Sequence, residues 1–297
     1  MTHVTVCICT FRRRTLLRRL LCNVVNQNTN GRFTFSVVVV DNDLEQSAKS
    51  IVEDAQSRTE INIEYRVENR RGIPLARNKA LEDIKGDFVA FVDDDEMPTA
   101  GWLLTLIEIC DQYRAAGVVG TTKPEFVGHP PAWVVHGRFY DRFNLPTGST
   151  VEWTQGRTGN VLFKKMLFDE EQPAFRQEFL SGEDQDFFRR MIAKGHRFVW
   201  CGDVLAYEVI SPERWTRSFM LKKALLQGFV GIHDPAFGAK DVAKSMCAAT
   251  AYMALLPITL VLGQHYFMRY SVKLFHHFGR LLGALGIKPI KAAYVTG

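Results

Sequence analysis

The sequence predicts an α/β fold in which helices cover both faces of a mostly parallel sheet, followed by a helical tail. Two observations predict the sheet: short continuous apolar runs, such as the one that ends at Asp41, recur along the first 210 residues, and segments with helical spacing separate them. The tail is predicted by residues 245–268, which contain no Asp, Glu, Lys or Arg.

The elements follow in order along the chain. Strands are expected at 3–10, 35–43, 61–67, 86–95, 117–122, 197–201 and 203–208. Helices are expected at 14–27, 45–58, 73–84, 101–116, 183–195 and 213–228. Pro74 lies near the first turn of its helix, where a missing N–H costs nothing. Residues 124–160 are rich in Pro, Gly and aromatic residues with little periodicity, which is typical of a functional loop region.

Charge and cysteine content limit the class of protein. The chain has a formal charge of +5, but residues 240–297 alone carry seven Lys or Arg and one acid, a net +6. The first 239 residues therefore carry a net −1, which argues against a nucleic-acid-binding body and for a tail near an anionic surface. The six cysteines form no CxxC pair, so we expect reduced thiols in a cytosolic compartment. A strand begins almost at the first residue, so we expect no signal peptide.

Three consecutive aspartates, Asp93, Asp94 and Asp95, follow the expected buried strand FVAFV. Their carboxylates repel one another, so something positive is expected beside them. Mg²⁺ and Mn²⁺ prefer oxygen ligands and commonly lie between one or two carboxylates and a substrate diphosphate. A solvated acidic turn is the alternative.

Weaker signals lie at the same expected edge of the sheet, where the carboxyl ends of parallel strands meet. Asp41 could accept a hydrogen bond from a nucleobase or ribose, or it could start a turn. Phe11, in CTFRR, could stack on a base. Arg77 lies one turn into its helix and could reach a phosphate or an acidic neighbour, unless that helix is only a surface helix.

A third acidic cluster, SGEDQDFF, opens the helix expected at 183–195. Carboxylates in the first turn are favoured as caps and by the helix dipole. Alternatively, Glu183 or Asp184 points into a cleft as a general base that activates a hydroxyl.

In this order, CTFRR, VVVVDND, GIPLARNKALEDIKGDFVAFVDDDE and GEDQDFF resemble the motifs of the family 2 glycosyltransferases, which have the GT-A fold. The resemblance covers residues 3–210, and it is closer to the succinoglycan-type glycosyltransferases of bacterial exopolysaccharide synthesis. It implies an inverting, metal-dependent enzyme that uses Mg²⁺ or Mn²⁺ to move a sugar from a nucleotide-diphospho-sugar, a UDP-sugar, to a saccharide hydroxyl. The acceptor would be lipid-linked, and the enzyme would lie on the inner face of the cell membrane as a cytoplasmic, peripheral or monotopic protein.

The resemblance also implies roles for single residues. Thr10, Phe11 and Arg12 would contact the nucleotide, Asp41 would bind uracil, and Arg77 would bind substrate. Asp93 would lie on the ribose side, Asp94 would belong to the substrate-binding residues and Asp95 would bind the metal. Gly159 and Asn160 match the stretch that lines the donor-sugar pocket, and Asp184, with Glu183 beside it, matches the catalytic base.

The same resemblance suggests an organisation of the chain. Residues 1–239 would form the GT-A domain, with a nucleotide-binding half (1–122) and an acceptor-binding half (123–239). Residues 240–297 would form a membrane-associating tail, which could lie at the interface, span the membrane or form a soluble helical subdomain.

Two departures from the family pattern matter. Tyr207 precedes Glu208 where related sequences often have a metal-binding His, and SPERW keeps only Arg214 and Trp215 of the motif of processive members. Three other functions remain open: a polyprenyl-phosphate glycosyltransferase, a nucleotidyltransferase and a non-catalytic membrane scaffold. The first would need no base at Asp184, because a phosphate acceptor is already ionised.

Overall fold

The computed structural model describes residues 1–179, 182–233 and 237–289, which fall into two compact units. The first, here called the sheet unit, comprises Met1–Pro124 and Arg142–Val209. The second, the helical unit, comprises Glu125–Asp141 and Ile210–Gly297. The boundary at 239/240 that the sequence suggests stays a prediction.

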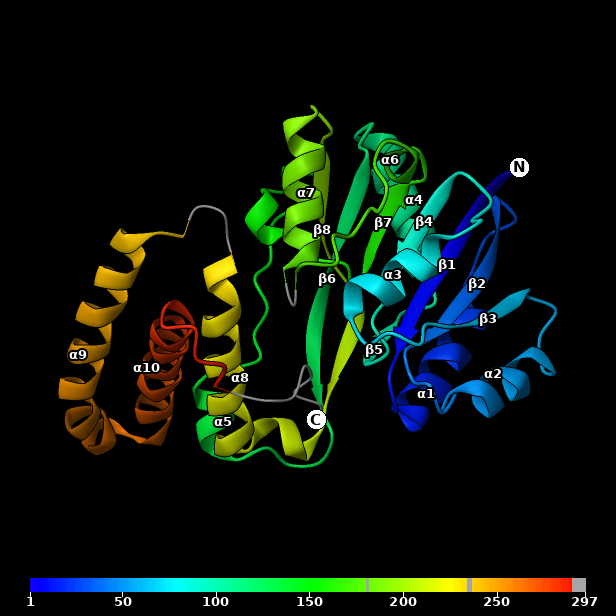
Figure 1. Cartoon of the computed structure of the whole chain (residues 1–297). Helices are drawn as coiled ribbons and strands as arrows, with labels where there is room; N and C mark the ends of the chain where they lie inside the picture. Colours follow the sequence, from blue (N-terminus) through cyan, green and yellow to red (C-terminus); the bar gives the residue numbers. More distant parts are fainter. Residues whose placement is uncertain (180–181, 234–236, 290–297) are drawn as a thin grey trace. The chain divides into compact units, whose positions relative to one another are not determined.

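Four parallel strands form the first half of the sheet, as the continuous apolar runs predict (Figure 1). They are β1 (Thr2–Thr10), β2 (Phe33–Asp41), β3 (Ile63–Val67) and β4 (Phe88–Phe91). Thr10 lies opposite Asp41 in the β1–β2 register, so the polar residues that end both strands meet at one edge.

The second half of the sheet is antiparallel where its pairing is resolved. Its strands are β5 (Glu96–Pro98), β6 (Gly117–Phe126), β7 (Val161–Lys164) and β8 (Phe198–Ile210), and the complete order is β3-β2-β1-β4-β7-β6-β8-β5. The sequence did not predict β5 or β7, because runs of three and four residues are too short to show a period. The two strands expected at 197–208 form one long strand, β8, which continues through Gly202.

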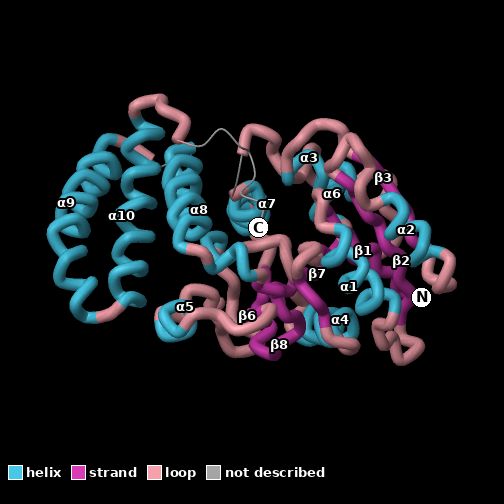
Figure 2. Tube along the Cα trace, turned by 90° about the horizontal axis from the view of Figure 1, so that it is seen from below, coloured by secondary structure: helices cyan, strands magenta, loops and turns pink. Residues whose placement is uncertain are grey.

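Helices cover both faces of this sheet (Figure 2). They are α1 (Arg14–Val25), α2 (Lys49–Gln56), α3 (Ile73–Leu81), α4 (Trp102–Gln112), α6 (Met166–Asp169) and α7 (Glu183–Ala193). One hydrophobic core includes residues of α1, α2 and α4, and the other includes residues of α3, α6 and α7. The predicted α/β fold class is therefore confirmed.

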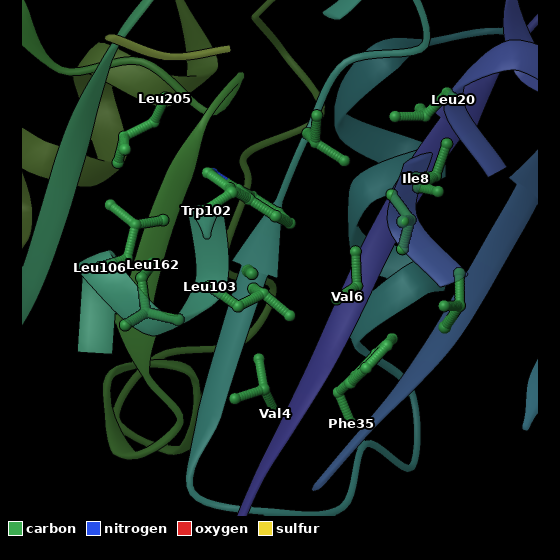
Figure 3. Packing of buried hydrophobic residues seen from close by; sticks show 14 of the residues in the cluster. Val4, Val6, Ile8, Leu20, Phe35, Trp102, Leu103, Leu106, Leu162 and Leu205 are labelled. Atoms are coloured by element: carbon green, nitrogen blue, oxygen red, sulfur yellow. The ribbon is translucent and has the colours of Figure 1, made fainter. Parts of the chain in front are cut away.

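Strand β1 shows how the sequence produces these two cores. Val4, Val6 and Ile8 alternate along the strand and pack with α1 and α4 in the first core, which also includes Leu103 and Leu106 (Figure 3). Cys7 points to the opposite face and belongs to the second core. A strand that is buried on both faces needs no polar side chain, which explains the continuous apolar run.

The helical unit contains α5 (Ala132–His136), α8 (Arg217–Val230), α9 (Ala239–Leu262) and α10 (Gln264–Ala284). Within this unit α10 lies between α8 and α9 and packs against both (Figures 1 and 2). Gly263 forms the turn that joins α9 to α10, with the positive φ of 134° that glycine tolerates. Of the described helices, α9 is the one long and apolar enough to cross a membrane, with a mean hydropathy of 1.8.

Helices α8 and α10 approach each other closely because glycines lie at their crossing. A methyl group added to Gly279 would overlap with the carbonyl oxygen of Leu225, and one added to Gly228 would overlap with that of His276. The two backbones therefore meet without an intervening side chain.

This contact leads to a prediction about stability. Alanine is favoured over glycine by about 1 kcal/mol within a helix, so Gly279→Ala would stabilise an isolated α10. In the folded unit the added methyl group must instead push α8 and α10 apart, and we expect a net destabilisation of about 1–3 kcal/mol. Urea unfolding measures this difference. Gly238→Ala is the matched control, because the position faces open space at a negative φ. Equal stability of Gly279→Ala and the natural protein would show that the helices are not in this close contact.

Candidate functional site

Polar residues gather at the carboxyl edge of β1, β2 and β4, where the sequence places Thr10, Asp41 and the aspartate triplet. The Thr10 hydroxyl donates a hydrogen bond of 2.8 Å to Asp94 Oδ2, which joins the end of β1 to the loop after β4. The predicted meeting of these two motifs is therefore found in the structure.

The three aspartates differ in their surroundings. Asp94 is buried, and its second oxygen accepts a 2.7 Å bond from Arg13 Nη1. The same nitrogen donates to Asp95 Oδ2 at 3.2 Å. The Asp93 side chain is 48% exposed, and its Oδ1 lies 3.6 Å from Arg77 Nη2. Two guanidinium groups therefore offset the repulsion within the triplet.

These charges act on one another. Burial raises the pKa of Asp94 above its usual value, and the Arg13 charge opposes that rise. Burial also has the largest effect on Arg13 and would lower its pKa, but the charges of Asp94 and Asp95 raise it. Arg13 therefore stays protonated beside residues 93–96, which are here called the acidic loop.

Arg77 connects the loop after β4 to the start of α7. It is buried in α3, pairs with Glu183 through a short contact, and also faces Asp93. The neighbouring Asn78 exchanges two hydrogen bonds with the backbone of Phe175, which fixes α3 against the segment before α7. Arg77 thus reaches acidic neighbours, one of the two partners that the sequence suggests for it.

The carboxylates that open α7 have separate partners. Glu183 is buried against Arg77, whereas Asp186 is buried against Arg189 and Arg190. Asp184 is half-buried and accepts a 2.8 Å hydrogen bond from the Gln185 N–H. Among the described residues it has no ion pair. The Gln185 N–H is one of the first-turn amides that lack a partner within the helix, so Asp184 also helps to satisfy the start of α7. Ser181, which precedes this helix in the sequence, lies outside the described residues.

Both Glu183 and Asp184 have a raised pKa. For each, burial is the largest cause and the nearby Arg77 charge opposes it. A carboxylate without an ion pair and with a raised pKa is suited to accept a proton.

The predicted nucleotide-binding residues lie at the ends of β1 and β2. The Phe11 ring is flanked by Arg12 and Arg71, whose guanidinium carbons lie 5.3 and 5.2 Å from its centre. Asp41 is fully buried and accepts hydrogen bonds from the Ala48 N–H at 2.7 Å, the Asp43 N–H at 3.1 Å and the Tyr65 hydroxyl at 3.0 Å. Their contacts with a nucleotide stay predictions.

The predicted sugar-pocket residues lie against the acidic loop. A methyl group added to Gly159 would lie 2.7 Å from Asp93 Oδ2 and 3.1 Å from Glu96 Oε2, so a larger residue there would push these carboxylates away. Asn160 has a φ of 49°, and its side chain accepts from Trp102 Nε1 at 2.7 Å and donates to Thr121 O at 3.1 Å. Asn160 therefore fixes the loop that brings Gly159 to the carboxylates.

Several charged residues of this region were not singled out from the sequence. Arg13 is one of three consecutive arginines, and the letters do not tell which of them turns inward. Glu96 is the fourth acid of its run; it lies opposite Glu208 in the β5–β8 pairing, and both are buried. Glu208 pairs with Arg142, while Tyr207, which stands at the departure from the family pattern, is 43% exposed.

The acidic loop also suits a hard cation. Among the described residues no three His, Cys, Asp or Glu side chains form a complete metal-binding group. Such ions often take only one or two protein carboxylates and complete their shell with water and substrate phosphates. Glu96 Oε2 is buried without a hydrogen-bond partner, and burial raises the pKa of this carboxyl well above its usual value. Oxygen-only donors with an unsatisfied carboxylate fit Mg²⁺ or Mn²⁺ at this loop.

Comparison with known proteins agrees with the geometry. A family model described as glycosyl transferase family 2 matches residues 5–170. The chain is 29% identical to the succinoglycan biosynthesis protein ExoM of Rhizobium meliloti, over 97% of this chain and 95% of that protein.

Two solved structures share the fold. The mannosyltransferase PcManGT from Pyrobaculum calidifontis, in complex with GDP-Man and Mn²⁺, has a TM-score of 0.66 at 18% identity, covering 96% of this chain and 88% of that one. Residues 1–349 of S. aureus TarS, in complex with UDP-GlcNAc, have a TM-score of 0.55 at 18% identity, covering 98% and 93%.

The ion pair between Arg77 and Glu183 leads to a prediction. Arg77→Met leaves a buried carboxylate without its partner, so we expect it to cost roughly 3–5 kcal/mol of unfolding free energy. The double variant Arg77→Met/Glu183→Gln should recover most of this loss, which urea unfolding in a double-mutant cycle measures. If the two single losses simply add, the pair does not interact in solution.

The pH dependence provides a second measurement. Without Arg77 the pKa of Glu183 rises further above its value in the unfolded chain. A raised pKa in the folded state gives stability that is lost as pH rises through it. The deficit of Arg77→Met should therefore be smallest at acidic pH and grow toward neutral pH.

Proposed function

Because the chain belongs to glycosyl transferase family 2 and is a glycosyltransferase, we propose that it moves a sugar from a nucleotide-diphospho-sugar to a saccharide hydroxyl with inversion. The observation that carries this proposal is Arg77, whose ion pairs hold the aspartate loop after β4 beside the start of α7. The donor-binding and base-bearing motifs thereby share one site.

Asp184 is the base we propose. Glu183 and Asp186 already neutralise buried guanidinium groups, and removing either would break a buried ion pair. Asp184 can accept the proton of an acceptor hydroxyl, whose oxygen attacks the anomeric carbon as the bond to the diphosphate breaks. Glu183 keeps Arg77 in place. Attack from the face opposite the diphosphate converts an α-linked donor into a β-linked product.

We propose that the donor is a UDP-sugar held at the strand ends. Phe11 and Arg12 would lie against the base, Thr10 and Asp41 would border it, and Asp93 would face the ribose. Asp94 would hold the loop in place, and the Gly159–Asn160 turn would border the sugar. Asp95 would hold Mg²⁺ or Mn²⁺, and the positive charge of the ion would offset the negative charge of the leaving diphosphate.

The helical unit supports a membrane-bound acceptor. The last residues of α9 expose apolar side chains: Ile258, Leu260, Val261 and Leu262 are 57–88% exposed. No charged residue lies between 245 and 268, and Lys240, Lys244, Arg269 and Lys273 flank this stretch. Apolar tips flanked by basic residues suit an anionic bilayer surface. We propose that the α9–α10 turn enters the inner leaflet of the cell membrane.

The acceptor we propose is therefore a lipid-linked oligosaccharide of bacterial exopolysaccharide synthesis. The similarity to the succinoglycan biosynthesis protein over 97% of the chain supports this place. An acceptor held in a bilayer can be reached by an enzyme that is itself held at the surface.

Asp184→Asn tests the base. The amide keeps the size of the carboxylate but takes no proton at neutral pH, so single-turnover transfer should fall at least about a hundredfold. Melting temperature and donor binding should stay near those of the natural protein. In the natural protein the rate should fall as the pH is lowered, because protonation removes the base. The midpoint of this fall should lie above the ordinary carboxyl pKa of 3.8, because burial raises the pKa of Asp184.

Asp169→Asn, on the exposed surface of α6, is the matched control and should change neither the rate nor the pH profile. Transfer by Asp184→Asn at the natural rate would eliminate Asp184 as the base. Combined with transfer to a polyprenyl phosphate, that result would favour the phosphate-acceptor alternative. Absence of transfer from every donor would favour the scaffold.

Two charges at the proposed membrane tip test the location. Leu260→Asp/Val261→Asp changes two exposed side chains, so the fold should persist while sedimentation with phosphatidylglycerol liposomes falls at least about tenfold. Ala243→Asp/Cys247→Asp adds the same charge at exposed positions near the other end of α9. It should bind normally if only the tip inserts, whereas a spanning α9 would make both pairs weaken binding. Normal binding by the tip variant would refute insertion of the tip.

A further inference from the structure

We infer that Arg13 is a positioning residue whose positive charge balances the acidic loop through its ion pairs with Asp94 and Asp95. Arg13 must move away from Asp95 before a divalent cation can bind there. This inference rests on the proposed role of Asp95 in metal binding. It assigns to Arg13 a control of metal affinity by direct competition.

The geometry shows an asymmetric clamp. Arg13 Nη1 lies 2.7 Å from Asp94 Oδ1 but 3.2 Å from Asp95 Oδ2. Asp94 is also held by the Thr10 hydroxyl at 2.8 Å, so both of its oxygens are used. The Arg13 side chain is 26% exposed and directly precedes α1. The contact with Asp95 is therefore the one that can be given up while the Asp94 contact keeps Arg13 in the site.

The position of Arg13 conflicts with a second cation. An oxygen that binds a divalent ion cannot keep a guanidinium group at hydrogen-bonding distance without repulsion between like charges. The loop carries four carboxylates, from Asp93 to Glu96, and Arg13 and Arg77 form ion pairs with three of them. Arg13 thus lies at Asp95 Oδ2, where its positive charge opposes the binding of a divalent ion to this carboxylate.

The consequence is that metal and nucleotide should bind together. A free divalent ion must displace Arg13 from Asp95 without compensation. A diphosphate that arrives with the ion offers the released guanidinium an anionic partner. Arg13 therefore makes binding of the ion alone weak and binding with nucleotide strong.

The experiment measures Mn²⁺ affinity of the full-length protein by calorimetry and by the electron paramagnetic resonance signal of free Mn²⁺, with and without UDP. Arg13→Gln should bind Mn²⁺ alone about tenfold more tightly than the natural protein, because a neighbouring positive charge is lost. The enhancement of Mn²⁺ binding by UDP should shrink by a similar factor. Arg13→Met is a second uncharged variant, and Arg13→Lys, which keeps the charge, should restore weak binding.

The sign of the change separates this role from a structural one. If Arg13 only held the loop in shape, both uncharged variants would bind Mn²⁺ more weakly or equally, and that outcome would overturn the inference. Arg14→Gln is the matched control on the same segment, since Arg14 is exposed and contacts Ser50. Asp95→Asn should lose Mn²⁺ binding in either background. Failure of every protein to bind Mn²⁺ in the presence of UDP would instead refute the metal site itself, and both proposals with it.

Discussion

The contact of buried Arg77 with Asp93 and Glu183 is the interaction on which the proposed active site depends. Asp93 follows a central parallel strand, whereas Glu183 opens a helix that is 90 residues further along the chain. These two carboxylates repel each other unless a positive charge lies between them. The guanidinium group supplies that charge and has the geometry to face two carboxylates at once. Arg77 thus holds the aspartate triplet and the start of α7 at a fixed distance from each other.

Much of this arrangement could be predicted from the sequence. Continuous apolar runs located β1, β2 and β4, and polar residues at their ends located the edge where Thr10 meets Asp94. The pairing of Arg77 with Glu183 was harder to predict, because the sequence is compatible with either a phosphate or an acidic residue as the partner of Arg77. Distance along the chain carries no information about such contacts, and only the folding of α3 and α7 into one shared core decides between the two partners.

Other features depend on backbone geometry that residue types do not reveal. Arg12 adopts a positive φ of 56°, which is uncommon for a residue with a side chain, and this turn separates Arg12 from Arg13. Arg12 consequently pairs with Asp43 near the end of β2, while Arg13 reaches Asp94. Strands β5 and β7 escaped prediction for a related reason. Each has only three or four residues, which form a strand because they pair with a neighbouring strand, β8 for β5 and β4 for β7, and not because of a periodic pattern of their own.

Charge balance connects the two arginines of the loop to substrate binding. A nucleotide-diphospho-sugar and a divalent ion bring charges of about −2 and +2, so together they leave the net charge of the site unchanged. Either one alone would add uncompensated charge to a partly buried region, where it is costly. Arg77 forms an ion pair with buried Glu183, and if Arg77 moved away the Glu183 carboxylate would be left buried without a partner. The Arg13 side chain is 26% exposed, against 9% for Arg77, so Arg13 can exchange partners at lower cost. The charge balance of the loop can therefore be rearranged without disturbing the base on α7.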